Sequence, residues 1–508
     1  MSIFDEMSMP HVLLGVGLLT FLLYRQVIRR LTLRLPPGPR RLPIIGNALQ
    51  IPSKSSWVTF AKWGEIYGGI VYLSVPGETM ILLNSPEIVN ELLEKRSAIY
   101  SDRPVQITTS ELMGFGPFLP VCGYGSYHRE GRRIMANGLS SRKAAEIRHL
   151  QQQKMNRFLG KLLHTPEDLW SHIRWFIASI SFGVSHGYSV ESLDDPLVRL
   201  AERANSEYCM AAEPGAFLVN IIPALRYVPE WFPGAGWKQK MKAWRQTTES
   251  LRDEPFEYVK EQLAKGVAKP SITASLIEEN PNRTEEEDRL FRYMSSSIYS
   301  AGADTTVSAV EAFFLAMVLY PEVQRKVHNE LDTILGPGHL ADWEDLERLT
   351  YVQAVIFEIY RWNPVAPIGL PHRVVQDDVY EGYHIPAGAT ILVNNWGILH
   401  NPALYPDPFE FKPERYLQSK DTGLNPDPRQ FAFGYGRRVC PGRGLAEDSI
   451  FIAVASVLAL FEISKALNAD GTPIEPDPTF DGFIGHPQPF RARVTPRFPN
   501  VERMIPAL

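Results

Sequence analysis

Apolar residues recur at intervals of three and four along most of this chain, which is the spacing of helices that bury one face or more. This pattern predicts helices over residues 86–95, 144–163, 290–319, 321–335, 351–362 and 445–463. Two short apolar runs, residues 70–73 and 80–83, lie on either side of Pro76-Gly77 and predict a pair of strands. A further strand is expected at residues 390–394. The expected fold class is therefore mainly α with a smaller β part.

The periodic pattern stops between residues 401 and 441. Seven prolines in this stretch rule out long regular elements. A long irregular segment inside a compact domain usually has a function, and this one leads directly to Cys440.

The N-terminal segment is the most apolar part of the chain. Residues 12–23 carry no charge, and Tyr24 then leads into four arginines, Arg25, Arg29, Arg30 and Arg34. We expect residues 1–34 to form a transmembrane anchor with a basic flank, which places the remaining chain in the cytosol by the positive-inside rule. A cleaved signal peptide is the competing interpretation, but there the basic flank would precede the apolar core.

Five prolines and glycines at residues 36–39 and 43 follow the anchor, so residues 35–50 are expected to form a semi-rigid hinge, with an ordinary linker as an equal alternative. The remaining residues, 51–508, contain no linker, repeat or low-complexity run, and we interpret them as one large domain.

Composition narrows the function. With 44% hydrophobic and 21% charged residues, the 508-residue chain is typical of a globular protein. Its net charge of −5 offers no basic footprint for nucleic acid, so nucleic-acid binding is not expected. The three cysteines form no C-x-x-C pair, which argues against a disulfide framework or a zinc cluster. We expect Cys122 and Cys209 to be buried small hydrophobic residues.

Cys440 lies in a different setting. The sequence around it follows the pattern F-x-x-G-x-R-x-C-x-G, formed by Phe433, Gly436, Arg438, Cys440 and Gly442. Gly434, Gly436 and Gly442 permit positive φ and leave amide N–H groups free to face a sulfur anion, and nearby arginine charge would help to keep a thiolate. A single thiolate ligand suits haem iron better than zinc, which requires three or four protein ligands.

These residues resemble the cytochrome P450 superfamily, and the resemblance extends over nearly the whole chain. Residues 227–236 look similar to fungal, mushroom-type microsomal members. The resemblance implies the P450 fold and haem b, with Cys440 as the iron ligand. It also implies that Phe433 packs against the ligand loop and that Arg438 binds a haem propionate.

The resemblance also implies functions for two further groups of residues. Glu358 and Arg361 form an E-x-x-R pair on one helical face, which the family joins to Arg415 in a buried structural network. Gly302, Asp304 and Thr305 lie mid-helix, where glycine and threonine are poor helix formers. The family uses the groove beside such a glycine for dioxygen, and the acid and alcohol pass protons through water.

The haem propionates require cationic or donor partners. The candidates are Arg438, Arg132, His372 and Arg373. In the family, the arginine that corresponds to Arg132 usually ends a W-x-x-x-R motif, whereas this chain has His128 at the tryptophan position. His128 either donates to a propionate or is an ordinary, partly exposed histidine, and its protonation would add a pH dependence.

The resemblance implies a monooxygenase that takes electrons from NADPH through a separate reductase, with cytochrome b5 as a further partner, at the endoplasmic reticulum membrane. Basic residues near Cys440, including Arg437 and Arg443, are candidates for docking the reductase, and solvated surface is the alternative. The segments expected to face substrate, residues 105–120, 298–305, 365–370 and 482–484, are mostly apolar. They favour a hydrophobic terpenoid, polyketide or polycyclic aromatic in specialised metabolism or detoxification.

Two rival functions remain. A haem-thiolate isomerase or dehydratase would need no reductase, and it often lacks the acid and alcohol that Asp304 and Thr305 supply. A non-catalytic haem sensor or carrier would not need those residues at all.

Overall fold

The computed structural model describes residues 34–213, 215–417 and 425–506. It is 54% helical with 9% strand, which confirms the mainly helical fold class. The predicted membrane anchor lies at residues 1–34, and all of it except Arg34 falls outside the described residues.

Helices account for most of the fold. The α-helices are α2 (Ser56–Tyr67), α3 (Pro86–Val89), α4 (Ser97–Tyr100), α5 (Ser126–Gly138), α6 (Ala144–His164), α7 (Leu169–His186), α8 (Pro196–Ala212), α9 (Gly236–Ala264), α10 (Ile272–Glu279), α11 (Glu285–Leu319), α12 (Pro321–Ile334), α13 (Thr350–Trp362), α14 (Asn395–Leu399), α15 (Arg429–Ala432), α16 (Arg443–Leu460) and α17 (Val501–Met504). Short helices of other types are η1 (Ala48–Gln50), η2 (Asn90–Lys95), η3 (Ile107–Leu112), η4 (Pro166–Asp168), η5 (Leu218–Asn220), η6 (Pro223–Tyr227), η7 (Pro413–Tyr416) and η8 (Gly436–Arg438).

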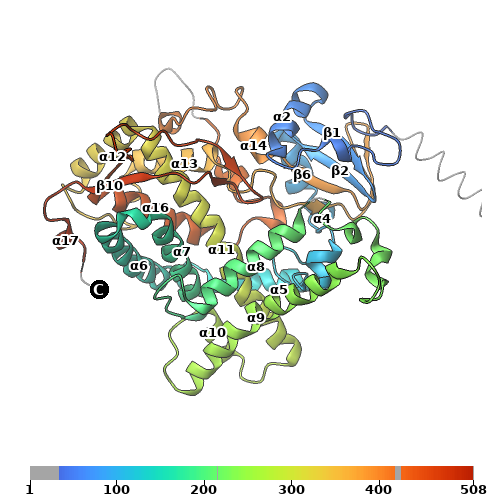
Figure 1. The fold of residues 1–508 in the computed structure, drawn as a ribbon, viewed down its shortest axis with the longest axis horizontal. Helices are drawn as coiled ribbons and strands as arrows, with labels where there is room; N and C mark the ends of the chain where they lie inside the picture. Colours follow the sequence, from blue (N-terminus) through green and yellow to red (C-terminus); the bar gives the residue numbers. More distant parts are fainter. Residues whose placement is uncertain (1–33, 214, 418–424, 507–508) are drawn as a thin grey trace, which may run out of the picture.

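The strands form one four-stranded sheet and three small pairs. They are β1 (Ile70–Val75), β2 (Glu78–Leu83), β3 (His372–Arg373), β4 (Asp378–Tyr380), β5 (Tyr383–Ile385), β6 (Thr390–Val393), β7 (Phe461–Lys465), β8 (Phe480–Asp481), β9 (His486–Pro487) and β10 (Ala492–Pro496). The larger sheet has the order β1-β2-β6-β3, in which β2 and β6 are parallel and the other neighbours antiparallel. It lies at the upper right of Figure 1, beside α2 and α14.

The predicted hairpin and the strand at residues 390–394 are confirmed as β1, β2 and β6. Five of the six predicted helical ranges are also helical throughout or nearly so, although residues 90–95 of the first form a π-helix. The sixth prediction, residues 445–463, was wrong at its end. Its helix stops at Leu460, and residues 461–463 belong to β7, where alternate residues are buried against β10.

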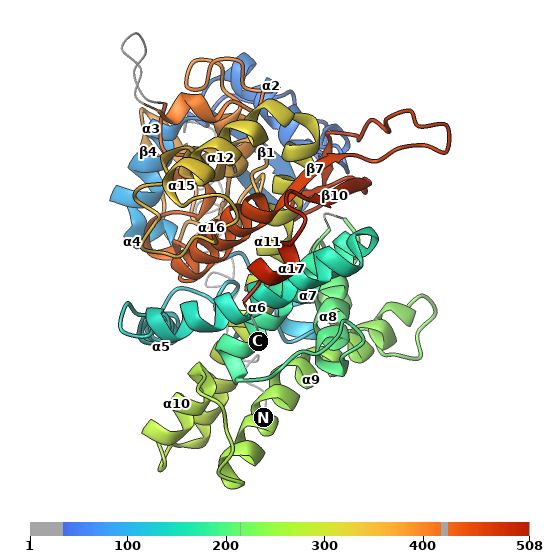
Figure 2. The same ribbon diagram turned by 90° about the vertical axis from the view of Figure 1, so that its left-hand side faces the viewer.

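The core is built around α11, which runs through the centre of the molecule and packs on α7, α9 and α16 (Figures 1 and 2). Among the described residues, α11 is the one helix long and apolar enough to cross a membrane, but 72% of its apolar window is buried. It is therefore a core helix of this domain.

The segment expected to form the hinge, residues 35–50, is hydrogen-bonded to the domain. The Pro37 carbonyl accepts a hydrogen bond of 2.8 Å from Tyr72 N in β1, and Asn47 N donates to Ser74 O at 2.6 Å. A Cβ on Gly38 would lie 2.2 Å from Tyr72 O, so only glycine allows this close approach. The segment is thus attached along the edge of the sheet.

The middle of α11 differs from its two ends. Most residues from 290 to 299 and all residues from 306 to 318 are buried, whereas residues 300–305 are not. When the middle of a central helix is not covered by other side chains, that part of the helix borders an internal space. The predicted residues Gly302, Asp304 and Thr305 all lie in this open stretch.

Candidate active site

Cys440 is carried by a loop that two glycines bend sharply. Cys440 N donates to Phe433 O at 2.7 Å, which closes the loop just before α16. Gly434 and Gly436 have φ of +78° and +53°, and a Cβ on Gly436 would lie 2.2 Å from Leu93 O. Gly442 was expected to have a positive φ as well, but its φ is −88°. Its contribution is the backbone N–H that it directs at the thiol.

Burial of Cys440 works against the thiolate form of its side chain. Cys440 is open to solvent on one side yet lies among many protein atoms. Burial therefore raises the pKa of its thiol, although the Gly442 N–H and the charges of Arg132 and Arg443 act in the opposite direction. In the protein without a bound metal, the desolvation of a sulfur anion outweighs these groups, and the expectation that they keep a thiolate at a haem iron stays a prediction. A bound metal cation would reverse the balance.

Three arginines converge beside this loop, of which Arg103 and Arg438 are buried and Arg132 is half-buried. Arg132 donates a hydrogen bond to Val439 O. Arg438 donates to Ser101 O and to Cys122 O, and both of these bonds are 2.7 Å long. Arg103 donates to Pro120 O at 2.9 Å and to the carbonyls of residues 370 and 371. Within the described part of the chain none of the three forms an ion pair with a carboxylate. Burial lowers the pKa of all three guanidinium groups, that of Arg103 to about 9.

Two histidines border the same cluster. Burial and the charges of Arg438, Arg132 and Arg103 lower the pKa of His128 to about 3, and its buried Nδ1 has no hydrogen-bond partner among the described residues. Burial and Arg103 likewise lower the pKa of His372 to about 3, and its Nδ1 lies 2.8 Å from Tyr100 O. His128 is thus buried and neutral, so the expected pH dependence near neutrality does not arise from the protein alone.

Arg373 does not join this cluster, because its Nε donates to Asp102 at 2.8 Å. Arg103, in contrast, was missed by the sequence reasoning. The available signal was Asp102-Arg103-Pro104, a charged pair directly before a segment expected to face substrate.

Phe433 packs against the ligand loop from the side of α13. Its ring lies 5.2 Å from that of Tyr360 at an angle of 71°, and the Arg443 guanidinium lies 5.4 Å from its centroid. Aromatic and cation–π contacts of this kind hold the loop against the helix.

Across the open stretch of α11, the predicted acid and alcohol have partners within the protein. Thr305 Oγ1 donates to Ala301 O at 2.8 Å, one turn back along the helix. Asp304 Oδ1 lies 3.3 Å from Nε2 of His486 in β9, and Nδ1 of the same ring lies 2.8 Å from Glu311 Oε2. Gly302 has open space beside it, since a Cβ there would meet only Ser181 Oγ, at 3.8 Å.

His486 and Glu311 were also missed from the sequence. The available signal was the i, i+7 spacing of Asp304 and Glu311, which places two acids on one face of an otherwise apolar helix. A carboxylate buried in this way requires a cationic or donor partner.

The E-x-x-R pair is buried, and the structure brings Arg415 to it. Arg361 Nε and Nη2 donate to the two oxygens of Glu358, each at 2.8 Å, and Arg415 Nε donates to the same carboxylate at 3.1 Å. Arg361 also donates to the carbonyls of Leu399, Pro408 and Glu410. The network thereby ties α13 to the irregular segment that leads to Cys440.

The sequence model of the cytochrome P450 family matches residues 36–494. The chain belongs to this family. A cytochrome P450 monooxygenase 208 of Postia placenta is 42% identical over 476 residues, covering 93% of this chain and 92% of its own. The monooxygenase claR of Ampulloclitocybe clavipes is 40% identical, covering 99% and 93%, and a tryptamine 4-monooxygenase of Psilocybe cyanescens is 40% identical, covering 93% and 95%. This P450 is accordingly an oxidoreductase of small molecules with fungal relatives.

The P450 family implies a haem, and the residues present fit one. A haem carries two carboxylates, and the arginines of the cluster lack carboxylate partners within the described residues. The buried, unpaired Nδ1 of His128 and the thiol of Cys440 supply the remaining donors that such a group requires.

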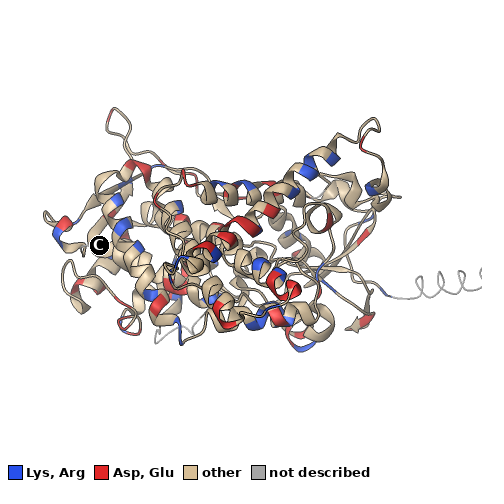
Figure 3. Ribbon diagram, turned by 90° about the horizontal axis from the view of Figure 1, so that it is seen from below, with Lys and Arg blue, Asp and Glu red and all other residues tan. Residues whose placement is uncertain are grey.

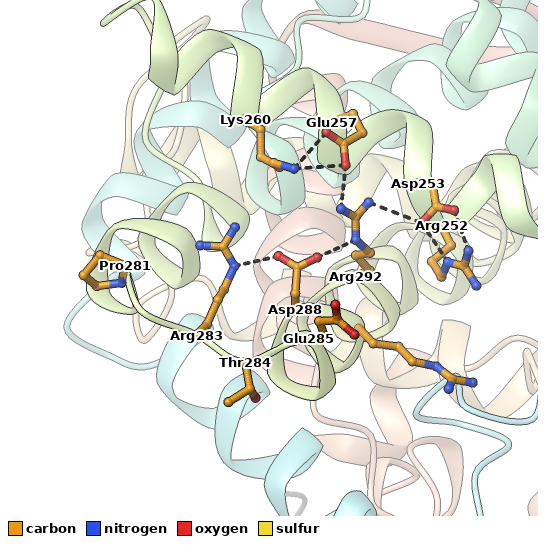
Figure 4. Close-up of a pocket in the computed structure, with 11 residues that line it drawn as sticks. Arg252, Asp253, Glu257, Lys260, Pro281, Arg283, Thr284, Glu285, Asp288 and Arg292 are labelled. Carbon is orange, nitrogen blue, oxygen red and sulfur yellow. Dashed lines mark hydrogen bonds and ion pairs between the residues drawn. The ribbon is translucent and has the colours of Figure 1, made fainter.

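A hollow of about 850 Å³ lies between α9 and the start of α11, away from the Cys440 loop. Figure 4 shows that its charged side chains point at one another: Arg292 binds Asp253, Glu257 and Asp288, and Arg283 binds Asp288. Basic and acidic residues are also intermixed on the side of the molecule that Figure 3 shows. Because the charges of this hollow are largely paired internally, we assign it no ligand.

Proposed function

We propose that this P450 is a haem-thiolate monooxygenase that takes Cys440 as its iron ligand. The observation that carries the proposal is an accessible cysteine on a glycine-bent loop beside three buried or half-buried arginines, which form no ion pair with a carboxylate among the residues that the structure describes. A thiolate for the iron and cations for the propionates are the groups that a haem requires from a protein.

In this proposal Arg132, Arg438 and Arg103 hold the propionates, and His128 donates to one of them. His372 in β3 borders the same cluster and is a further candidate donor to the propionates. Arg373 acts indirectly, because its ion pair with Asp102 fixes the strand next to Arg103. When bound, the haem supplies the iron that activates dioxygen, which is chemistry that no side chain offers.

The open stretch of α11 provides space and protons. Gly302 leaves room beside the helix, and Asp304 is oriented by His486. Burial opposes ionisation of Asp304, but the hydrogen bond and charge of His486 lower its pKa below the ordinary value. We infer that the ionised Asp304 carboxylate and the Thr305 hydroxyl together orient water beside Gly302, and that protons reach the reaction through this water.

We infer that the substrate is a hydrophobic small molecule of specialised metabolism, such as a terpenoid, polyketide or polycyclic aromatic. The expected substrate-facing segments support this class. Phe115 packs edge-on against Tyr208 of α8 at 4.9 Å, and Met113, Phe118 and Leu119 are buried beside it. Apolar walls of this kind favour apolar ligands.

We infer that electrons come from NADPH through a separate reductase, with cytochrome b5 as a second donor. A hollow of about 390 Å³ lies beside Pro441, between α6, α13 and α16. Arg437 is exposed nearby, whereas Arg443 is already paired with Glu447 at 3.0 Å. Of the two arginines expected to dock the reductase, Arg437 is therefore the stronger candidate.

Membrane attachment through residues 1–34 remains part of the proposal. Large apolar side chains that include Ile44 and Trp231, 96% and 81% exposed, lie on two neighbouring segments. A Cβ on Gly46 would lie 2.0 Å from Ser74 O in β1, and a Cβ on Gly77 would lie 3.2 Å from Ile221 O, so both segments border the same hairpin. An exposed apolar surface next to an anchor fits a domain that rests on the endoplasmic reticulum membrane.

The deciding experiment is a reduced carbon monoxide difference spectrum of the purified chain. We expect the Soret shift of thiolate ligation in the wild type and its loss in Cys440→Ala. Cys122→Ala is the matched control, since that thiol is buried and contacts Leu119 O. A shift that survives in Cys440→Ala, or haem binding without any shift, would refute the assignment and favour a haem sensor or carrier.

A further inference from the structure

His486 lies between two carboxylates of α11. Its Nε2 is 3.3 Å from Asp304 Oδ1, and its Nδ1 is 2.8 Å from Glu311 Oε2. The Glu311 side chain is 1% exposed and that of His486 26% exposed. Asp304 and Glu311 are seven residues apart and so lie about two turns apart on one face of the helix. One imidazole of β9 thereby bridges two acidic side chains on this face of α11.

The bridge is held in place by the backbone that precedes it. The Gly485 carbonyl accepts hydrogen bonds from Ser308 Oγ at 2.8 Å and from Asn363 Nδ2 at 2.9 Å, and Gly485 N donates to Val365 O at 2.9 Å. Ser308 lies between Asp304 and Glu311 on the same face of α11. Contacts from α11 and from the segment just after α13 therefore fix the start of β9 and limit the positions that the ring can take.

The surrounding charges favour a protonated ring. Burial lowers the pKa of His486, but its hydrogen bonds to Asp304 and Glu311 outweigh burial and raise that pKa to about 9. The other titratable groups nearby are Asp481, opposite His486 in β8, and Arg174, Cys209 and Glu213, which act on or beside Asp304 from α7 and α8. Asp481 Oδ1 accepts from Gly482 N, and none of these groups lies within ion-pair distance of the imidazole.

We propose that His486 is a positioning residue for Asp304, holding this carboxylate ionised and in one orientation, and that Glu311 fixes the imidazolium for that task. The inference rests on the proposed function, in which Asp304 orients the water that carries protons. Without a cation beside it, burial would favour the protonated acid, which donates a hydrogen bond instead of accepting one. Glu311, buried and away from the open stretch, balances the second N–H of the ring and prevents it from turning.

The inference can be tested first without any activity measurement. Hydrogen–deuterium exchange at the Cε1 position of each histidine, followed by mass spectrometry, gives the pKa of His486 in the haem-loaded full chain. We expect a value well above 6.5 in the wild type and a lower one in Asp304→Asn and in Glu311→Gln. Ser308→Ala is the matched control, because it loosens Gly485 without changing a charge and should leave the pKa raised. A wild-type value near 6.5 would overturn the inference.

The second test is the pH profile of coupling, the product formed per NADPH consumed. His486→Gln retains a donor toward Asp304 but cannot carry a proton. We expect its acidic limb to move to higher pH, because Asp304 loses the cation that keeps it ionised, and its alkaline limb near pH 9 to disappear. An unchanged profile in a variant with an intact Soret shift would overturn the inference and leave the proposed function standing. A wild type without that shift would overturn the proposed function, and the His486 titration would still test the bridge.

Discussion

Replacing Glu358 with alanine tests whether the buried network braces the fold. Glu358 and Arg361 are 0% exposed and Arg415 is 5% exposed. The Glu358 carboxylate accepts from both arginines and also from Lys412 N at 2.8 Å. Its removal leaves two cations and one amide without their acceptor in a place that water does not reach.

The magnitude follows from this burial. Removing one partner of a buried ion pair costs about 3–5 kcal/mol, because the other charge remains uncompensated. Arg361 keeps its bonds to the carbonyls of Leu399, Pro408 and Glu410, so we expect the lower end of this range. Glu358→Gln should cost less, since its carbonyl still accepts one of the bonds.

The chain offers a matched control with the same spacing. Glu130 and Arg133 also form an E-x-x-R ion pair on a helix, but their side chains are 41% and 65% exposed. Exposed pairs contribute between zero and about 1 kcal/mol, so Glu130→Ala should be nearly neutral. Removing the glutamate of the buried pair should therefore destabilise the protein, whereas removing that of the exposed pair should not. The two pairs have the same spacing, so burial accounts for the difference.

The assay is urea unfolding of the haem-loaded chain, followed by tryptophan fluorescence and by Soret absorbance. The loss of stability is the shift of the midpoint multiplied by the common slope. We expect Glu358→Ala to unfold at clearly lower urea and to lose haem in the same transition. Equal midpoints for Glu358→Ala and Glu130→Ala would refute the argument that burial of this pair decides its effect.

Four further outcomes are expected. Gly436→Ala should lower stability and haem content, measured by urea midpoint and Soret absorbance, because its Cβ would lie 2.2 Å from Leu93 O at a φ of +53°. Gly302→Ala should raise the free energy of unfolding by up to about 1 kcal/mol, seen as a slightly higher urea midpoint, because the site has room and alanine is the better helix former; turnover should fall. Arg103→Leu should weaken haem retention, followed by transfer of haem to apomyoglobin, while His164→Leu on the surface should not. A pKa of His486 raised from 6.5 to about 9 corresponds to about 3 kcal/mol of folding stability. This contribution should be complete below pH 6.5 and should be lost as pH rises through 9. The difference in urea midpoint between the wild type and His486→Gln, followed against pH, measures it.

Helices with one buried face could be predicted from the sequence, whereas others could not. Almost every residue of α7 is buried, so the helix lacks the polar face that produces a periodic signal. In α9 an internal proline, Pro255, obscures the helical pattern. The strand β7 was mistaken for the end of α16 because its alternation becomes visible only when β10 is known to cover one face.

The sequence by itself determined the ligand loop and the composition of α11. Glycines, prolines and a cysteine at close spacing constrain the backbone within a few residues, so the bent loop at Gly434 and Gly436 and the candidate ligand Cys440 could be identified locally. The stretch around Gly302 was identified only as a run of poor helix formers inside a helix. Only the tertiary structure decided which charges meet. Arg103 reaches Arg438 across 335 residues, and His486 reaches Asp304 and Glu311 across at least 175. Such pairings depend on how distant elements pack and on how much water they exclude, and neither quantity is encoded in the spacing of neighbouring residues.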